Sequence, residues 1–166
     1  MLDLVLVIGA VKARILKWSA IAGLTSNMNQ ITDNIWMGGQ NNPRKIVSEG
    51  FKAVLDLREK DDLQYKKSLE DYGIHYLNIK INDGEGAPPH ILKSIAEWLQ
   101  EKKESGQKTL VHCTLGRGRG ALATAAHLIH QGESVEEALN LIKNRRSVTY
   151  MNDKQLKALK IFSEQI

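Results

Sequence analysis

The sequence contains a single cysteine, Cys113, among 166 residues. With one thiol the chain cannot form an internal disulfide or a zinc site built on several thiolates, and a reducing, cytoplasmic setting is expected. Aromatic residues are also scarce, at 5%, and no aromatic RNA-binding signature is present. The net charge is only +4, so we do not expect nucleic acid as a partner.

No uninterrupted apolar run is long enough to cross a bilayer, which needs about 20 residues. Residues 2–11 are nearly all apolar, but three basic residues follow them before and beside Trp18. A secretory signal has the opposite order, with its basic residues first. Two alternatives remain for residues 1–24: an element packed on the domain, or a segment that makes peripheral contact with a membrane.

What the chain does have is the composition of one globular domain, with 42% apolar and 25% charged residues. Its length suits one domain and is short for two. A polar stretch at 25–30 follows the apolar N-terminus. We therefore expect an N-terminal segment at 1–28 and a main domain at 29–166.

Strand and helix patterns alternate along the main domain. The predicted strands cover 31–37, 51–57, 75–81 and 109–112. The predicted helices cover 43–48, 62–72, 89–103, 121–129, 135–144 and 152–166. The helix at 121–129 is apolar on nearly all sides, which indicates burial. This order predicts an α/β fold with a central mixed sheet flanked by helices.

The segment HCTLGRGRG, residues 112–120, joins a predicted strand to the predicted buried helix. Its glycines let the backbone curl so that several N–H groups face one centre, and the helix N-terminus adds positive partial charge. Such a loop binds a tetrahedral dianion. The same field favours the thiolate of Cys113, a nucleophile. Arg119 presents a planar fork for two phosphate oxygens.

The Cys-x5-Arg spacing preceded by His112 resembles the protein tyrosine phosphatase superfamily, and the position of the loop along the chain resembles its small dual-specificity phosphatases. The resemblance covers about residues 31–166. It implies a dual-specificity-phosphatase-like fold, with 29–166 as the phosphatase catalytic domain. It also implies hydrolysis of phosphomonoesters through a phosphocysteine intermediate, without a metal or cofactor.

Site residues follow from the same resemblance. Cys113 is the expected nucleophile, Arg119 the phosphate clamp and Asp83 the general acid on a glycine-containing loop, with Glu85 as the alternative acid. The expected phosphate-binding loop comprises Thr114, Leu115, Gly116, Arg117 and Gly118.

Three supporting residues are expected around this loop. His112 is expected to orient the loop by hydrogen bonding. Arg58 either braces the active-site loops or forms an ion pair with Asp56 or Glu59. Asn152 is expected to cap the last helix and to contact the loop.

One position departs from the family pattern. Most members carry Ser or Thr after the arginine, where the hydroxyl hydrogen-bonds the leaving thiolate, but this chain has Gly120. We expect slower breakdown of the phosphoenzyme, which keeps open the alternative of a pseudophosphatase that captures phosphate groups without turnover.

The substrate has two further alternatives. Short loops around the pocket favour phosphorylated proteins, with phosphotyrosine and phosphoserine or phosphothreonine as targets. The segment 109–129 is also similar to mitochondrial-type phosphatidylglycerophosphate phosphatases, which share an arginine at the position of Arg117. A phospholipid, either phosphatidylglycerophosphate or a phosphoinositide, is therefore the alternative substrate.

Two other readings of the motifs fail. The glycines of the loop fit G-x-G-x-x-A, but a dinucleotide fold needs a strand ending in an acidic residue where 135–144 has a helical pattern. His127 and His130 are neighbours on a helix, but no carboxylate accompanies them there, so we expect no metal site.

Overall fold

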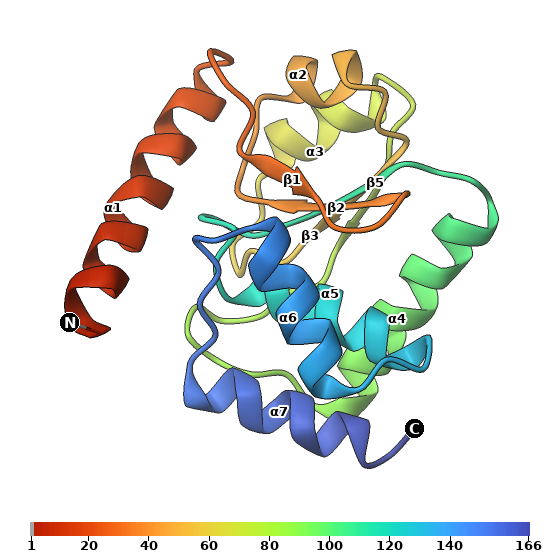
Figure 1. The fold of residues 1–166 in the computed structure, drawn as a ribbon. Helices are drawn as coiled ribbons and strands as arrows, with labels where there is room; N and C mark the ends of the chain where they lie inside the picture. Colours follow the sequence, from red (N-terminus) through yellow and green to blue (C-terminus); the bar gives the residue numbers. More distant parts are fainter. Residues whose placement is uncertain (1) are drawn as a thin grey trace.

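The computed structural model describes residues 2–166, with side chains from residue 4 onward. One five-stranded sheet lies at its centre, in the order β1-β2-β5-β3-β4 (Figure 1). The strands are β1 (Met28–Gln30), β2 (Ile35–Gly38), β3 (Ala53–Asp56), β4 (His75–Asn78) and β5 (Thr109–His112). β1 is antiparallel to β2, and all other neighbours are parallel, so the sheet is mixed as predicted.

Helices cover both faces of this sheet (Figure 1). One face carries α2 (Pro43–Ser48) and α3 (Leu63–Glu70). The other carries α4 (Pro89–Glu104), α5 (Arg119–His130), α6 (Val135–Arg145) and α7 (Asp153–Ser163). The predicted fold class, a central mixed sheet flanked by helices, is confirmed.

Side chains of each central strand alternate between two cores, as strand geometry requires. In β5, Leu110 packs in the core under α2 and α3, while Val111 packs in the core under α4 to α7. Val54 and Leu55 of β3 divide in the same way. The sheet is thus fixed from both sides.

α5 is the buried helix of the larger core. Every residue from Arg119 to Ile129 is buried, as the apolar pattern of 121–129 predicts. Small alanines on this helix let α4, α6 and α7 pack closely around it. Because α5 follows directly after Cys113, its packing fixes the position of the loop between strand and helix.

The prediction of a strand at 31–37 is wrong in its first half. Residues 28–38 form a hairpin whose strands are β1 and β2, and the Thr32 hydroxyl at the turn accepts a hydrogen bond from Ile35 N at 3.2 Å. Thr, Asp and Asn favour such a turn because their side chains bond nearby backbone groups. β1 itself lies within the expected joint at 25–30, where three residues of mixed polarity carry little strand signal.

The other predicted elements are present with shifted ends. The strand predicted at 51–57 is the shorter β3, and that predicted at 75–81 ends at Asn78. α6 begins with a capping box, in which the side chains of Ser134 and Glu137 bond each other's backbone N–H groups.

α1 (Leu2–Ile21) lies along one side of the domain (Figure 1). Ala13 and Ala20 on its inner face are fully buried, and Asn42 donates from its backbone N to Ala20 O at 3.1 Å. The segment is thus a helix packed on the domain, one of the two alternatives. Within the described residues, no helix has the length and apolar character that a membrane crossing needs.

Three parallel strands end at the same edge of the sheet. Gly38, His112 and Asp56 are aligned in register at the carboxyl ends of β2, β5 and β3. Loops that leave neighbouring parallel strands at their carboxyl ends commonly form binding sites in α/β folds. The loop that begins at Cys113 leaves from the middle of this edge.

Candidate active site

The loop after β5 curls around the sulfur of Cys113. This side chain is buried, and its Sγ accepts a hydrogen bond from the backbone N of Gly116 at 3.3 Å. Gly116 has φ of +69°, and a Cβ there would overlap the backbone of Gly38. Only glycine therefore lets this turn lie against the end of β2 while its N–H faces the sulfur.

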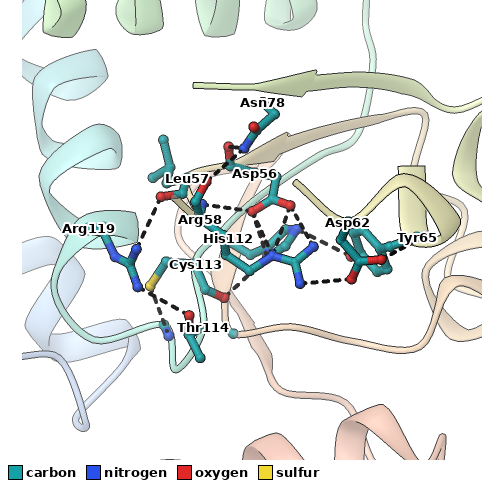
Figure 2. A network of polar contacts seen from close by, with 12 residues as sticks. Asp56, Leu57, Arg58, Asp62, Tyr65, Asn78, His112, Cys113, Thr114 and Arg119 are labelled. Carbon is teal, nitrogen blue, oxygen red and sulfur yellow. Dashed lines mark hydrogen bonds and ion pairs between the residues drawn. The ribbon is translucent and has the colours of Figure 1, made fainter. Parts of the chain in front are cut away.

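Arg119, the first residue of α5, is buried beneath the same loop, and Figure 2 shows its guanidinium beside the Cys113 sulfur. Its Nη1 donates to Ile81 O at 3.0 Å, and its Nη2 donates to Thr114 Oγ1 at 3.2 Å. Its Nε is also buried but has no hydrogen-bond partner among the described residues. A buried donor without a partner is costly, which fits a position meant for an anionic ligand.

Asp83 approaches the guanidinium from the solvent side. Its Oδ1 lies 3.0 Å from Arg119 Nη2, although 83% of the Asp83 side chain is exposed. The loop that carries it is held from below, because Asn152 Nδ2 donates to Gly84 O at 2.8 Å. Glu85, the alternative acid, instead pairs with Lys154.

These residues line one open cleft of about 900 Å³. Its floor holds Cys113 and Arg119, and its rim holds the exposed side chains of Leu63 and Tyr150. Most of the predicted site residues lie on its wall: Asp83, Arg58, Thr114, Leu115, Arg117, Gly118 and Asn152. His112, at the end of β5, and Gly116, within the loop, are buried from solvent.

Behind the loop, Asp56 is the centre of a buried polar network (Figure 2). The Asp56 carboxylate accepts hydrogen bonds from Arg58 Nη2 at 2.7 Å and from the Tyr76 hydroxyl at 2.8 Å. Burial alone would raise the pKa of Asp56, but the charges of His112 and Arg58 together hold it below its ordinary value. Arg58 also pairs with Asp62. Arg58 thus forms the predicted ion pair with Asp56, inside a network rather than alone.

His112 links this network to the loop. Burial lowers the pKa of His112, although Asp56 opposes the shift. Its Nδ1 lies 3.2 Å from Cys113 O, which is an acceptor, so Nδ1 carries the proton. Nε2 then accepts from the Tyr65 hydroxyl at 3.3 Å. Its two ring nitrogens thus face the Cys113 carbonyl and the Tyr65 hydroxyl, and this contact with the loop backbone is consistent with the orienting role predicted for His112.

Arg146 is a site residue that the sequence analysis missed. It is buried under the loop, where Nε donates to Gly116 O at 2.8 Å and Nη2 donates to Leu115 O at 3.2 Å. Its two terminal nitrogens also donate to Asn29 Oδ1 and Asn27 Oδ1, each at 2.7 Å. Burial lowers the pKa of Arg146 to about 10, while the Cys113 sulfur opposes the shift, so the side chain is a cation at neutral pH. It adds positive charge behind the thiol.

Arg117 of the loop and Gln155 of α7 make further contacts at this site. Arg117 donates from Nε to Val148 O at 3.0 Å, and its guanidinium lies 5.7 Å from the ring centre of Tyr150. Gln155, also missed by the sequence analysis, is buried against Gly118, where a Cβ would lie 2.7 Å from its side-chain oxygen. Gln155 is the third residue of α7, so only the tertiary fold brings it to the loop.

Comparison with known proteins identifies the family. Residues 35–165 match the model of the dual specificity phosphatase catalytic domain. The chain belongs to the dual-specificity phosphatase family. Protein 123R of Invertebrate iridescent virus 6, whose name places it among the tyrosine phosphatases, is 27% identical over 80% of this chain and 89% of the viral protein.

Solved structures of phosphatases share its fold. The crystal structure of Tk-PTP in the active form has a TM-score of 0.78 and 28% identity, over 84% of this chain and 98% of that one. The structure of PTPMT1 in complex with PI(5)P has a TM-score of 0.75 and 22% identity, over 84% of this chain and 96% of that one. The chain is thus a phosphatase of the dual-specificity and tyrosine phosphatase type.

Gly120, the departure from the pattern of dual-specificity phosphatases, leaves room for a side chain. A Cβ at this position would lie 3.4 Å from Met37 Cγ and 3.8 Å from Gly38 O. The nearest atom belongs to a flexible side chain, so a small residue would fit. The surrounding structure therefore does not exclude a serine or an alanine at this position.

No cluster of three or more metal-ligating side chains occurs within the part of the chain that the structure describes. His127 points its Nδ1 at Ala96 O, 3.3 Å away on α4. His127 therefore has a hydrogen-bond partner in the backbone of α4.

Proposed function

We propose that this phosphatase hydrolyses phosphomonoesters through a phosphocysteine intermediate on Cys113. One observation carries the proposal: a thiol, a buried guanidinium with a free Nε, and an exposed carboxylate meet at one cleft. These are the three groups that phosphoryl transfer through a cysteine needs, namely a nucleophile, a charge clamp and a general acid.

In the proposed first step, the Cys113 thiolate attacks phosphorus while the bond to the leaving oxygen breaks. Arg119 binds two of the phosphate oxygens, and Asp83, protonated for this step, gives its proton to the leaving oxygen. In the second step Asp83 takes a proton from water, whose oxygen attacks the phosphocysteine and restores the thiolate. The ion pair between Asp83 and Arg119 breaks when the phosphate group of the substrate binds the guanidinium in place of the carboxylate.

Phosphorylated proteins are the substrate class we favour, with phosphotyrosine and phosphoserine or phosphothreonine as targets. The cleft is open and wide rather than a narrow channel, which supports acceptance of both long and short phosphorylated side chains. Leu63 and Tyr150 on its rim offer apolar contacts to a peptide. We further propose residues 29–166 as the catalytic domain, which includes the family match at 35–165, and 1–28 as an N-terminal segment that packs on it, although the boundary falls inside β1, which begins at Met28.

A phospholipid headgroup is the second candidate. Arg117 adds a cation at the cleft beside Arg119, which favours substrates with more than one anionic group. PTPMT1, whose solved structure contains PI(5)P, shares the fold.

The test is a phosphate-release screen with purified protein, using phosphotyrosine and phosphoserine peptides, phosphoinositides and phosphatidylglycerophosphate in vesicles. We expect release from the peptides and none from Cys113→Ser with any substrate. Release of phosphate from the lipids and not from the peptides would instead identify phospholipids as the substrate class. One equivalent of p-nitrophenol followed by no further release would instead support the capture of phosphate groups without turnover.

A further inference from the structure

α1 has two apolar faces, and only one of them packs on the domain. The inner face contains the buried Ala13 and Ala20 and the partly buried Leu6 and Leu16, spaced as one side of a helix. These residues account for the contact with the domain. They leave the opposite side of the helix without a protein neighbour among the described residues.

The outer face is apolar along its whole length. Its large side chains each expose between 50% and 68% of their area, and they are Leu4, Val5, Val7, Ile8, Val11, Ile15 and Trp18. At 3.6 residues per turn, all but Val5 fall within a stripe about 100° wide. Single exposed apolar residues are ordinary, but seven on one helix form a continuous surface that water solvates poorly.

Positive charge borders this stripe. Lys12 and Arg14 are exposed on its two sides, and Lys17 lies with its Nζ 5.2 Å from the ring centre of Trp18. Asp3 is the only acidic residue among the first 32, so this cationic border has almost no acid to oppose it. α1 lacks the polar opposite face of a free interfacial helix, because that face packs on the domain. Its outer face, an apolar stripe between basic side chains with a tryptophan near its end, still resembles the side of such a helix that enters a membrane interface.

We propose that the outer face of α1 docks this phosphatase on an anionic lipid bilayer. The apolar stripe enters the boundary between headgroups and acyl chains, and Lys12 and Arg14 reach the anionic headgroups. A second copy of the chain fits less well, because packing two such faces together would bring four like charges to one interface. The helix lies on the membrane and does not cross it, in agreement with its composition.

Docking at this face brings the membrane close to the cleft. A methyl group placed on Gly9 of α1 would lie 3.5 Å from Nη2 of Arg117, which also lines the cleft. The inner face of α1 therefore contacts the phosphate-binding loop while the outer face contacts lipid. The docking proposal does not depend on which substrate the cleft accepts.

The test is cosedimentation of the full chain with vesicles of phosphatidylglycerol and phosphatidylcholine, compared with phosphatidylcholine alone. We expect binding to the anionic vesicles that weakens as salt is raised. The double variant Ile8→Glu with Ile15→Glu should reduce this binding by at least about tenfold, and Lys12→Glu with Arg14→Glu by a similar factor. On binding, tryptophan emission should shift to shorter wavelength, and Trp18→Phe should abolish the shift.

A matched control replaces apolar residues that are exposed elsewhere, Tyr72→Glu with Ile161→Glu, and should leave vesicle binding unchanged. Hydrolysis of p-nitrophenyl phosphate in solution, retained by all variants, shows that each is folded and separates failure of docking from failure of the proposed catalysis. Three results would overturn the proposal: no vesicle binding, equal loss in the control variant, or concentration-dependent dimers that the Ile8→Glu and Ile15→Glu variant abolishes.

Discussion

At the scale of single residues, the site depends on positive charge gathered around one sulfur. Arg119 lies beneath the cleft with an unoccupied Nε, and Arg146 lies behind the loop with its cation facing backbone carbonyls and the sulfur. The Cys-x5-Arg motif reveals the first arginine. It contains no sign of the second, because Arg146 lies 30 positions beyond Gly116 and is held against the loop together with Asn27 and Asn29, more than 100 positions away in sequence.

Substitutions of Arg146 can distinguish the effect of its positive charge on the site from the effect of its hydrogen bonds on the loop. Arg146→Met removes the cation and leaves the carbonyl and amide oxygens around it without donors, so we expect a loss of about 2 kcal/mol or more in the free energy of unfolding. We also expect kcat/KM to fall, because a positive charge behind the nucleophile is lost. Arg146→Lys keeps this charge while it loses some of the hydrogen bonds that brace the loop, so it should retain more of kcat/KM than Arg146→Met. Equal kcat/KM for the two variants would show that Arg146 acts on structure alone.

Gly120 should limit the second chemical step. Gly120→Ser places a hydroxyl near the leaving thiolate, and a hydrogen bond to a charged group contributes about 1.5 kcal/mol, or about tenfold in rate. We expect faster steady-state release of phosphate and a smaller initial burst of p-nitrophenol in stopped-flow measurements. Gly120→Ala fills the same space without a hydroxyl and should leave the rate unchanged. Equal acceleration by both substitutions would assign the effect to helix stability.

At the scale of elements, the sequence patterns predicted α2 to α7 to within a few residues, and α2 and β5 with their observed ends. They left open whether the segment that forms α1 packs on the domain or contacts a membrane. The hairpin of β1 and β2 could not be predicted in the same way, because β1 has three residues and pairs only at the edge of the sheet. The sequence also provided no indication of the polar network around Asp56, because its members come from separate elements. Tyr65 and Tyr76 reach it from α3 and β4, and burial raises the pKa of both phenols, with Asp56 adding to the effect.

Packing of α5 against α4 should make stability depend on pH through His127. Burial lowers the pKa of His127 from 6.5 to about 4. Between these pH values the unfolded chain binds a proton that the folded chain does not, so the free energy of unfolding falls as the pH is lowered from 6.5 towards 4. The expected loss is on the order of 2 kcal/mol. His112 adds a loss of the same sign.

Denaturant unfolding across this pH range measures the loss. His127→Asn keeps a donor near Ala96 O but does not titrate, so its stability should vary less with pH than that of the parent chain. His90→Asn, at an exposed position on α4, is the matched control and should behave like the parent. If His127→Asn and the parent lose stability in parallel, the acid sensitivity belongs to other groups.

At the scale of the whole molecule, the candidate active site lies at one edge of the sheet, and α1 with its apolar outer face lies beside it. The loops after β2, β3 and β5 meet there because these strands are parallel and in register. α1 lies next to the resulting cleft through Gly9 and Arg117. The sequence predicted most of the residues of the cleft and the apolar character of the N-terminal segment. It did not predict that the two lie side by side, because this depends on how α1 packs on the domain.

Catalysis by thiolate, guanidinium and carboxylate should not require an added metal ion. We expect the rate of p-nitrophenyl phosphate hydrolysis to be unchanged by EDTA and to be inhibited by vanadate, which adopts the geometry of a transferring phosphoryl group. Loss of activity with EDTA, restored by a divalent cation, would contradict the proposed mechanism.

The central claim is that phosphate passes through the sulfur of Cys113. The measurement that tests it most directly is a rapid acid quench during turnover, followed by mass spectrometry of the peptide that contains this residue. We predict that the mass of one phosphoryl group is present on Cys113, that the adduct accumulates because Gly120 provides no hydroxyl, and that Cys113→Ser is inactive. Phosphate release without any adduct on Cys113, or with the phosphoryl group on another residue, would contradict the account.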